Sequence, residues 1–394
     1  MAFTRRRRKA VSSIVAGLIV IIIVLAGLTG YAFLAPGAST KTVTQTTTVQ
    51  GGGGGGSTVT TTVTTTASGQ GGGNLTALAQ AEGGSVTVYG VIDASDWSSV
   101  IGPAFQKQYP WAKVNFVALG GADVGTRALS EYTAGKVSAD VLISGLTQLE
   151  DAIQGGAVQP WIDPNLVTYG YTVNNSDPTG MWHPGYVLPG VIIYNTNLVS
   201  ASQAPKSYTD LASSTWKGKV VIQDPSLLGG VGATFSTLYP IMGNASWTQF
   251  MHNLAANSPV IVSSNGVAFT DVSSGQYPVG LGQLNDYIAA VQKGNTSVAA
   301  VFAQPVVGLP NVVCITKNAP HPYMAELLTD WLDSIPGQLA LAQTGRTPEN
   351  TLVSSTVLAP YVPTNVTIYA ADYNNPSFYT NTGTWSTTFH NIFG

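Results

Sequence analysis

Three strand-like runs, each followed by a helix-like segment, open the globular part of the chain. The runs at residues 86–91, 114–119 and 140–144 are rich in β-branched and apolar residues, and the segments after them place apolar residues on one helical face. Repetition of strand and helix predicts a parallel sheet covered by helices. Ligands of such sheets bind beyond the carboxyl ends of the strands, where helix N-termini point. We therefore expect binding residues at these ends: Asp93, Gly121, Ala122, Asp123, Ser144 and Gly145.

The second half of the chain continues the same pattern, with strand-like runs at 187–195, 216–224 and 278–282. A glycine-rich turn, Gly229–Gly232, follows the second of these runs and opens a helix. Its backbone N–H groups could bind an anion, although a tight turn without a ligand would have the same composition. A strand-like run at 311–316 then returns the chain to the first half of the fold. Two sheets joined by crossing strands predict two lobes with a hinged cleft, to which the second half would contribute Ser226, Gly230, Asn265 and Tyr287.

The N-terminus has a basic cluster, Arg5–Lys9, before an apolar or small-residue stretch from Val11 to Leu34. As a helix this stretch would extend about 36 Å, enough to cross a membrane. The basic cluster predicts a cytoplasmic N-terminus and a globular part outside the cell. A secretory signal peptide is the alternative, but its apolar region is usually shorter, about 7–15 residues. The junction at 8–13 resembles the cleavage site of archaeal pilin-like signals. We expect residues 1–36 to anchor the protein, whether or not they are cleaved after Ala10.

Residues 37–84 are dominated by Thr, Ser and Gly and include six consecutive glycines, Gly51–Gly56. So few apolar side chains cannot offset the entropy of ordering, which predicts a disordered linker. The linker is either a plain spacer or an O-glycosylated stalk. Sequons for N-glycosylation occur at Asn74, Asn174, Asn244, Asn295 and Asn365,.

Composition excludes several functional classes. Five of the 16 basic residues lie in Arg5–Lys9, so the remaining part has eleven basic against 19 acidic residues and no basic patch for nucleic acid,. The single cysteine, Cys314, cannot form an intrachain disulfide and lies in an apolar run that predicts burial,. Neither a Gly-x-Ser-x-Gly nor a His-Glu-x-x-His motif occurs, and the four histidines lack metal-site spacing,. We expect no enzymatic activity, no resident metal and no cofactor.

Several segments, taken in order, resemble the periplasmic ferric-iron-binding proteins and their relatives, the family 1-type extracellular solute-binding proteins of ABC importers. They are Val86–Tyr89, Ser138–Leu142, Val187–Asn195, Trp216–Lys219, Gly275–Leu281, Gly337–Pro348 and Phe389–Gly394. The resemblance covers nearly everything from Ser85 onwards. It implies an α/β, two-lobed periplasmic-binding fold of type II and delivery of a small solute to a permease and an ATPase. We expect one lobe to comprise residues 85–186 and 311–394, and the other to comprise residues 187–310.

Most metal ligands of the iron-binding proteins have no counterpart at the matching positions of this chain. Those proteins place a His after the first strand, a Glu after the third strand and paired tyrosines later, where this chain has Asp93, Gly145 and Tyr287-Ile288. The resemblance also extends to proteins that bind phosphorylated sugars, phosphonates, thiamine or polyamines. We expect an anionic or polar organic ligand; an iron-binding protein, with Tyr287 and Asp93 as ligands, is the alternative. A surface structural or adhesive glycoprotein is the alternative from another class, although we find no internal repeat.

Overall fold

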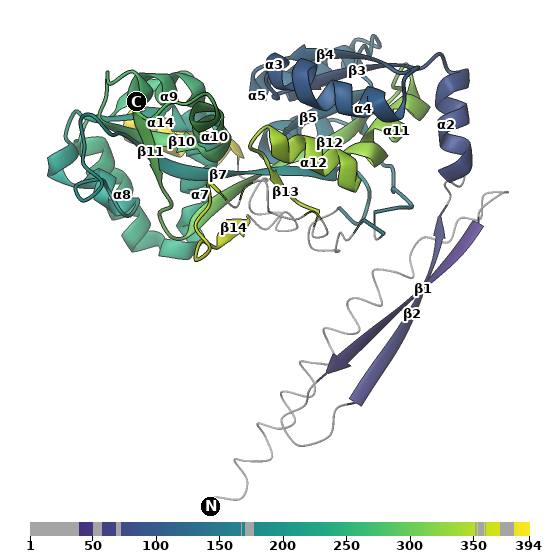
Figure 1. Cartoon of the computed structure of the whole chain (residues 1–394), viewed down its shortest axis with the longest axis horizontal. Helices are drawn as coiled ribbons and strands as arrows, with labels where there is room; N and C mark the ends of the chain where they lie inside the picture. Colours follow the sequence, from purple (N-terminus) through teal and green to yellow (C-terminus); the bar gives the residue numbers. More distant parts are fainter. Residues whose placement is uncertain are drawn as a thin grey trace, which may run out of the picture. The chain divides into compact units, whose positions relative to one another are not determined.

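The computed structural model describes residues 39–49, 57–67, 72–166, 168–169, 177–350, 353, 358, 360–370 and 382–394 (Figure 1). They belong to two compact units, Met1–Gly71 and Gly72–Gly394. The predicted anchor at 1–36 lies outside the described residues, as does the sequon at Asn174. Among the helices that are described, none is both long and apolar enough to cross a membrane.

The described part of the first unit is a pair of antiparallel strands, β1 (Ser39–Val49) and β2 (Ser57–Ala67). Ser39 lies opposite Ala67, and Val49 lies opposite Ser57. The prediction of a disordered linker over 37–84 is therefore wrong for these two segments. Their alternating Thr and Val residues are β-branched and favour extended backbone, a preference that the linker prediction left out.

The globular unit begins before the predicted boundary at Ser85. Helix α2 (Gly72–Ala81) packs against α11 (Pro322–Asp333), and Ala79 is fully buried. The carboxylate of Glu82 accepts a hydrogen bond from the backbone N–H of Met324 at 3.0 Å. Residues 72–84 are thus part of the fold, because Leu75, Leu78 and Ala79 recur at helical spacing and give α2 an apolar stripe,.

The three predicted strand–helix units form the first lobe. Its parallel strands are β3 (Ser85–Gly90), β4 (Lys113–Ala118) and β5 (Val141–Gly145), with β3 in the middle. The segments after them are α3 (Ala94–Asp96), the π-helix η1 (Trp97–Ile101), α4 (Gly102–Gln108), α5 (Gly121–Thr133) and α6 (Leu146–Gln154).

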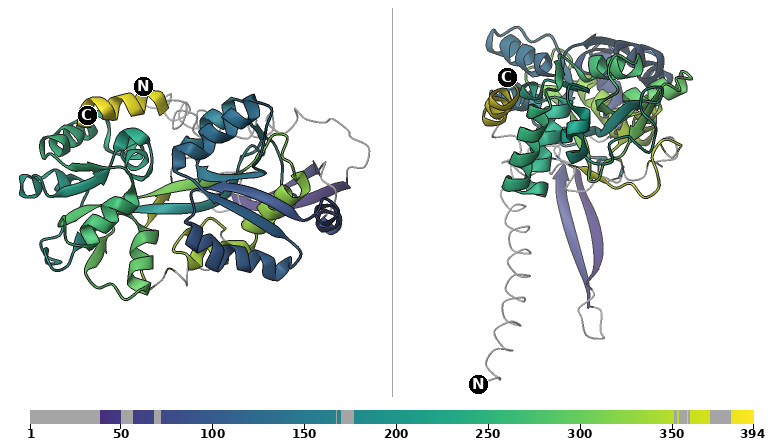
Figure 2. Two further views of the ribbon diagram at one scale, coloured as in Figure 1. Left: turned by 90° about the horizontal axis from the view of Figure 1, so that it is seen from above. Right: turned by 90° about the vertical axis from the view of Figure 1, so that its left-hand side faces the viewer.

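Two long antiparallel strands, β7 (His183–Asn195) and β12 (Val306–Thr316), run from the first lobe into the second. Every residue of both strands is buried, including Cys314. Figure 2 shows the helices of the two lobes on either side of these strands. The second lobe contains β8 (Val220–Gln223), β9 (Val260–Val262), β10 (Val279–Gln283), β11 (Val298–Val301), α7 (Gly230–Met242), α8 (Asn244–Ala256), α9 (Asn265–Ser273) and α10 (Leu284–Gln292).

The principal sheet has the strand order β4-β3-β5-β12-β7-β10-β8-β9. Short segments complete the described fold: β6 (Val158–Gln159), β13 (Thr347–Pro348), β14 (Ile368–Ala370), η2 (Thr209–Ala212), η3 (Ser214–Trp216), η4 (Pro225–Leu227) and α12 (Ile335–Gln343). The order places the ends of β3, β4 and β5 and the ends of β8, β9 and β10 on opposite sides of the crossing strands.

The C-terminal helix α14 (Thr382–Phe393) lies on the second lobe, where it packs against η4, α7 and α8 (Figure 2). We expected residues 311–394 to return to the first lobe, and for α14 that expectation is wrong. The reason is aromatic packing: Phe389 is fully buried, and its ring centroid lies 6.1 Å from that of Trp247 and 6.3 Å from that of Phe235.

Candidate functional site

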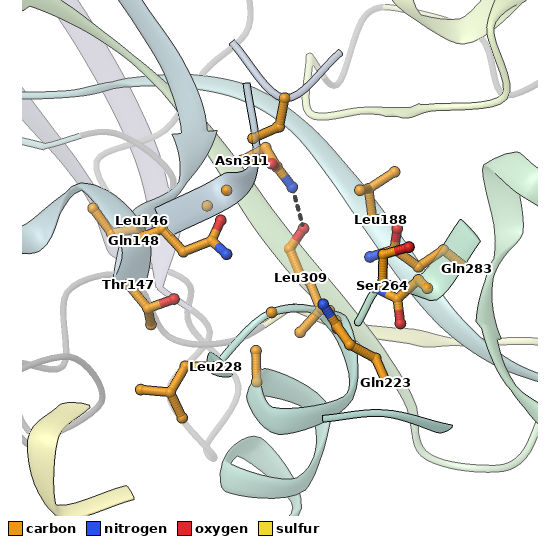
Figure 3. A pocket seen from close by; sticks show the side chains of 18 of the residues that line it. Leu146, Thr147, Gln148, Leu188, Gln223, Leu228, Ser264, Gln283, Leu309 and Asn311 are labelled. Atoms are coloured by element: carbon orange, nitrogen blue, oxygen red, sulfur yellow. Dashed lines mark hydrogen bonds between the residues drawn. The ribbon is translucent and has the colours of Figure 1, made fainter. Parts of the chain in front are cut away.

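A cavity of about 260 Å³ lies between the two lobes. The ends of β3, β4 and β5 border it on one side, those of β8, β9 and β10 on the other, and β7 and β12 also contribute to its wall (Figure 3). Among the described residues that line it, none has an ionisable side chain. The lining residues are Val91, Leu119, Gly120, Gly121, Gly145, Leu146, Thr147, Gln148, Leu188, Gln223, Leu228, Gly229, Gly230, Ala233, Ser264, Asn265, Gln283, Leu309, Pro310 and Asn311.

Five helices begin at this cavity, namely α5, α6, α7, α9 and α10. The residues that precede their first turns all line it: Gly120, Gly145, Gly229, Ser264 and Gln283. Only Ser264 of these five caps its helix with a side chain, by accepting from the N–H of Val267 at 3.2 Å. A helix start leaves N–H groups unpaired and has a partial positive charge. Convergence of such starts makes the cavity wall electropositive without any cationic side chain.

Five amide side chains also line the cavity: Gln148, Gln223, Asn265, Gln283 and Asn311. The side chain of Gln148 accepts at Oε1 from the hydroxyl of buried Ser144, at 3.0 Å. Asn311 donates to the carbonyl of Leu309 at 3.4 Å (Figure 3). Each amide can donate and accept, so this wall suits hydroxyl groups as well as an oxyanion.

Gln223 differs from the other amides because it is only 9% exposed while its Oε1 has no hydrogen-bond partner among the described residues. A buried polar atom without a partner costs stability, about 1–3 kcal/mol. Its position in the cavity wall means that a bound ligand could supply the missing partner (Figure 3).

Two glycines let the amides lie across the helix starts. A side chain at Gly121 would collide with the amide of Gln148, and one at Gly230 would collide with the amide of Asn265. The glycines therefore allow close approach of an amide and a helix N-terminus, which places donors of both kinds together.

Four of the predicted binding residues line the cavity: Gly121, Gly145, Gly230 and Asn265. Ser144 lies behind its wall and orients Gln148. Sequence reasoning missed Gln148, Gln223, Gln283 and Asn311. The strand-end rule could have found Gln223 and Gln283, because each is the last residue of its strand.

The other predicted residues lie elsewhere. Ala122 and Asp123 are exposed on the first turn of α5, and the carboxylate of Asp123 folds back beside Gly120. Ser226 belongs to η4, where its backbone N–H donates to Asp224 at 2.9 Å and its carbonyl accepts from Ser386 at 2.8 Å.

Neither Tyr287 nor Asp93 is among the described residues that line the cavity. Tyr287 packs against the apolar cluster of the second lobe, and burial, with a smaller contribution from Tyr194, raises the pKa of its hydroxyl. The Asp93 side chain is 68% exposed, with its carboxylate 3.6 Å from Arg346. Within the described ranges, no three His, Cys, Asp or Glu side chains are arranged to hold a metal ion.

The sequence from 137 to 369 matches the family model of the bacterial extracellular solute-binding proteins. The chain belongs to this family. The family and the fold are those of substrate-binding transport proteins rather than of enzymes. No curated protein matches this solute-binding protein.

Solved structures share its fold over about four-fifths of its length. Iron-bound HitA from Pseudomonas aeruginosa is 17% identical, with a TM-score of 0.64 over 78% of this chain and 99% of HitA. AfuA from Actinobacillus pleuropneumoniae, with fructose-6-phosphate bound, is 19% identical, with a TM-score of 0.68 over 78% of this chain and 98% of AfuA. The ferric binding protein from Campylobacter jejuni is 16% identical, with a TM-score of 0.65 over 78% of this chain and 99% of that protein. These likenesses confirm the predicted periplasmic-binding fold of the globular part and identify no ligand.

Proposed function

We propose that this solute-binding protein captures a small organic anion in the cavity between its lobes and delivers it to an ABC importer. The observation that carries the proposal is the convergence of five helix N-termini on a cavity whose described lining has no ionisable side chain. An anion there would meet backbone N–H groups and amide donors, and no carboxylate is among the described residues that line the cavity,.

The character of the wall also indicates the rest of the ligand. Amides and the hydroxyls of Thr147 and Ser264 match a hydroxylated body, while Leu119, Leu188 and Leu309 provide apolar contact surface. The volume lies just below the range of about 300–1,000 Å³ that is typical of drug-sized ligands, so a small metabolite fits. A phosphorylated sugar combines these properties, and fructose-6-phosphate occupies AfuA.

Iron is the less favoured ligand. Ferric iron needs several hard anionic oxygen ligands, whereas the described lining supplies only neutral oxygens. HitA was solved with iron, but at 17% identity its ligand does not transfer to this chain without the corresponding side chains.

The proposal includes the location and the partners. The apolar stretch at 11–34 would anchor the protein, with the globular unit outside the cell,. The membrane permease and the ATPase of the importer would be its partners. Family membership favours this role over the adhesive glycoprotein considered above.

Calorimetric titration with fructose 6-phosphate, fructose, inorganic phosphate and ferric citrate tests the ligand class. We expect fructose 6-phosphate to bind at one site and at least tenfold more tightly than fructose. At a hundred times its Kd, a bound ligand should raise the free energy of unfolding by about 2.7 kcal/mol. Binding of ferric iron alone, or of none of the anions, would contradict the proposal.

Tyr287→Phe provides an independent control for iron. A ferric–phenolate bond requires a deprotonated tyrosine and gives a visible colour. We expect the wild-type protein to stay colourless with ferric citrate, and Tyr287→Phe to leave anion binding unchanged. A coloured complex that the substitution abolishes would establish the iron-binding alternative.

A further inference from the structure

Arg346 is a buried cation at the junction of the two lobes. It follows α12 in the first lobe, and its side chain is 3% exposed. Its Nη1 lies 2.6 Å from Asp96 Oδ2 and 2.6 Å from Thr344 Oγ1, and its Nη2 lies 3.6 Å from Asp93 Oδ2. The ring of Tyr186 lies 5.3 Å from the guanidinium carbon. The remaining donor, Nε, is buried and has no acceptor among the described residues.

The first turn of α10, from the second lobe, packs against this segment. Gly345 has φ +83°, and a Cβ there would lie 3.0 Å from Asn285 Cα and 3.3 Å from Ile288 Cβ. Asn285 is 8% exposed and donates from Nδ2 to Asp286 at 3.1 Å. Its Oδ1 has no donor in the described part of the chain. An unpaired donor in one lobe and an unpaired acceptor in the other therefore lie on adjoining segments.

The same helix turn contributes to the cavity, because Gln283 immediately precedes α10 and lines the wall. We propose that Arg346 is a positioning residue that holds the first turn of α10 against the first lobe, so that the lobes close, and thereby sets Gln283 in the cavity wall. The inference rests on ligand binding in that cavity, but the latch itself can be measured without a ligand.

Asp286 makes the latch sensitive to pH. In the described part of the chain, the charged groups that act on it are Asp93, Asp96 and Arg346. Burial raises the pKa of Asp286 to about 6, the two carboxylates add to the increase, and Arg346 opposes it. In an opened cleft the side chain returns to water, where an aspartate has a pKa of about 3.9.

The direction of the pH effect follows from proton uptake. Between about pH 4 and pH 6 the closed form holds a proton on Asp286 that the open form has lost,. Closure is therefore strongest below pH 4 and weakens as the pH rises to 6. Without the guanidinium, three carboxylates would face one another, so the weakening would be larger and would continue above pH 6.

Hydrogen exchange of residues 284–292 in the ligand-free full chain, corrected for intrinsic rates from pH 4 to 7, measures the latch. We expect the protection of these residues in the wild-type protein to fall several-fold as the pH rises. In Arg346→Met, their protection at pH 7 should be at least tenfold lower than in the wild type. Asp286→Asn should remove the pH dependence, in the wild-type and in the Arg346→Met background. Arg127→Met is the matched control, because the Arg127 side chain is 47% exposed. Within the described ranges, the only carboxylate that pairs with it is that of Glu131, in the same helix α5.

Binding of fructose 6-phosphate to the same variants separates the latch from the function. We expect Arg346→Met to weaken binding at least tenfold at pH 7, and Arg346→Lys to recover part of the loss. If no variant binds the probe while the exchange results hold, the latch stands and the proposed ligand class is wrong. If Asp286→Asn leaves the pH dependence of exchange unchanged, or Arg346→Met lowers global stability without a specific effect on 284–292, the latch is overturned.

Discussion

The hydroxyl of Ser144 donates to Oε1 of Gln148 at 3.0 Å, from a fully buried position at the end of β5. The same hydroxyl lies 3.2 Å from the carbonyl oxygen of Gly121, so Ser144 connects the Gln148 amide to the start of α5. The amide lies over the start of α5 only because residue 121 is a glycine. Ser144, Gln148 and Gly121 thus form one arrangement that places a donor beside a helix N-terminus.

Gly121→Val should break this arrangement by displacing Gln148. A hydrogen bond to a charged group contributes about 1.5–3 kcal/mol, so we expect affinity for fructose 6-phosphate to fall roughly tenfold to a hundredfold. The obstructing atoms are the far end of a flexible side chain, so the thermal midpoint should change little. Gly266→Ala is the control: it lies in α9 beside the cavity, and the nearest atom to its Cβ is Ser264 Oγ at 3.9 Å. Equal affinities for the two variants would disprove the placement of Gln148 and the start of α5 in the binding site.

Gln223→Met should have opposite effects on stability and on binding. The substitution removes the unpartnered buried Oε1, so the ligand-free protein should gain about 1 kcal/mol of unfolding free energy. Binding should weaken, because the ligand loses a polar partner. Urea unfolding without ligand and calorimetry with fructose 6-phosphate measure the two quantities. Gln249→Met, on the exposed face of α8, should change neither. A less stable variant with unchanged affinity would contradict this assignment of Gln223.

The sequence was most informative at the ends of strands. Gly121, Gly145, Gly230 and Asn265 follow strands of a predicted α/β sheet, and all four line the cavity. The rule could not tell which residues of a helix start face the ligand, so it also selected Asp123, which is exposed beside Gly120 and is not among the lining residues. Gln148 lies inside a helix, and nothing in its local sequence distinguishes it from a surface glutamine.

Contacts between distant segments limited the prediction of the fold. Strand and helix patterns were sufficient to predict the two lobes and the strands that cross between them. The place of α14 depends on Phe389 meeting Trp247, more than a hundred residues earlier in the chain, and local periodicity has no information on such a pair. The contact of Gly345 with Asn285 across the lobes is hidden for the same reason.

Truncation tests the start of the globular unit. A chain that begins at Gly72 should unfold at the same urea concentration as the full chain, because α2 and its contacts with α11 are intact. A chain that begins at Gly84 loses buried Ala79 and the carboxylate of Glu82 at the start of α11. We expect a loss of about 2 kcal/mol or more, the order of exposing one large apolar side chain. Equal midpoints for the two chains would show that α2 does not contribute to stability.

Asp163 should make the stability of the protein fall as the pH rises. It is 3% exposed, accepts from the N–H of Asn165 at 2.7 Å, and has a second oxygen without a partner in the described part. Burial raises the pKa of Asp163 well above its usual range near 4, and nearby Asp333 and Asp330 raise it further,. The native state therefore holds a proton that the unfolded chain loses above about pH 4. The stabilisation is complete below that pH and declines as the pH increases toward the native-state pKa.

Asp163→Asn should remove this dependence, because an amide keeps the acceptor for Asn165 and is neutral at every pH. One unit of pKa corresponds to about 1.4 kcal/mol, so the variant should exceed the wild type by at least about 1 kcal/mol at pH 8. At pH 4 the two should be nearly equal. Urea unfolding at pH 4, 6 and 8 measures the difference, with exposed Asp123→Asn as the control. If Asp163→Asn were less stable than the wild type at pH 8, the expected stabilisation from removing the buried carboxyl group would be wrong.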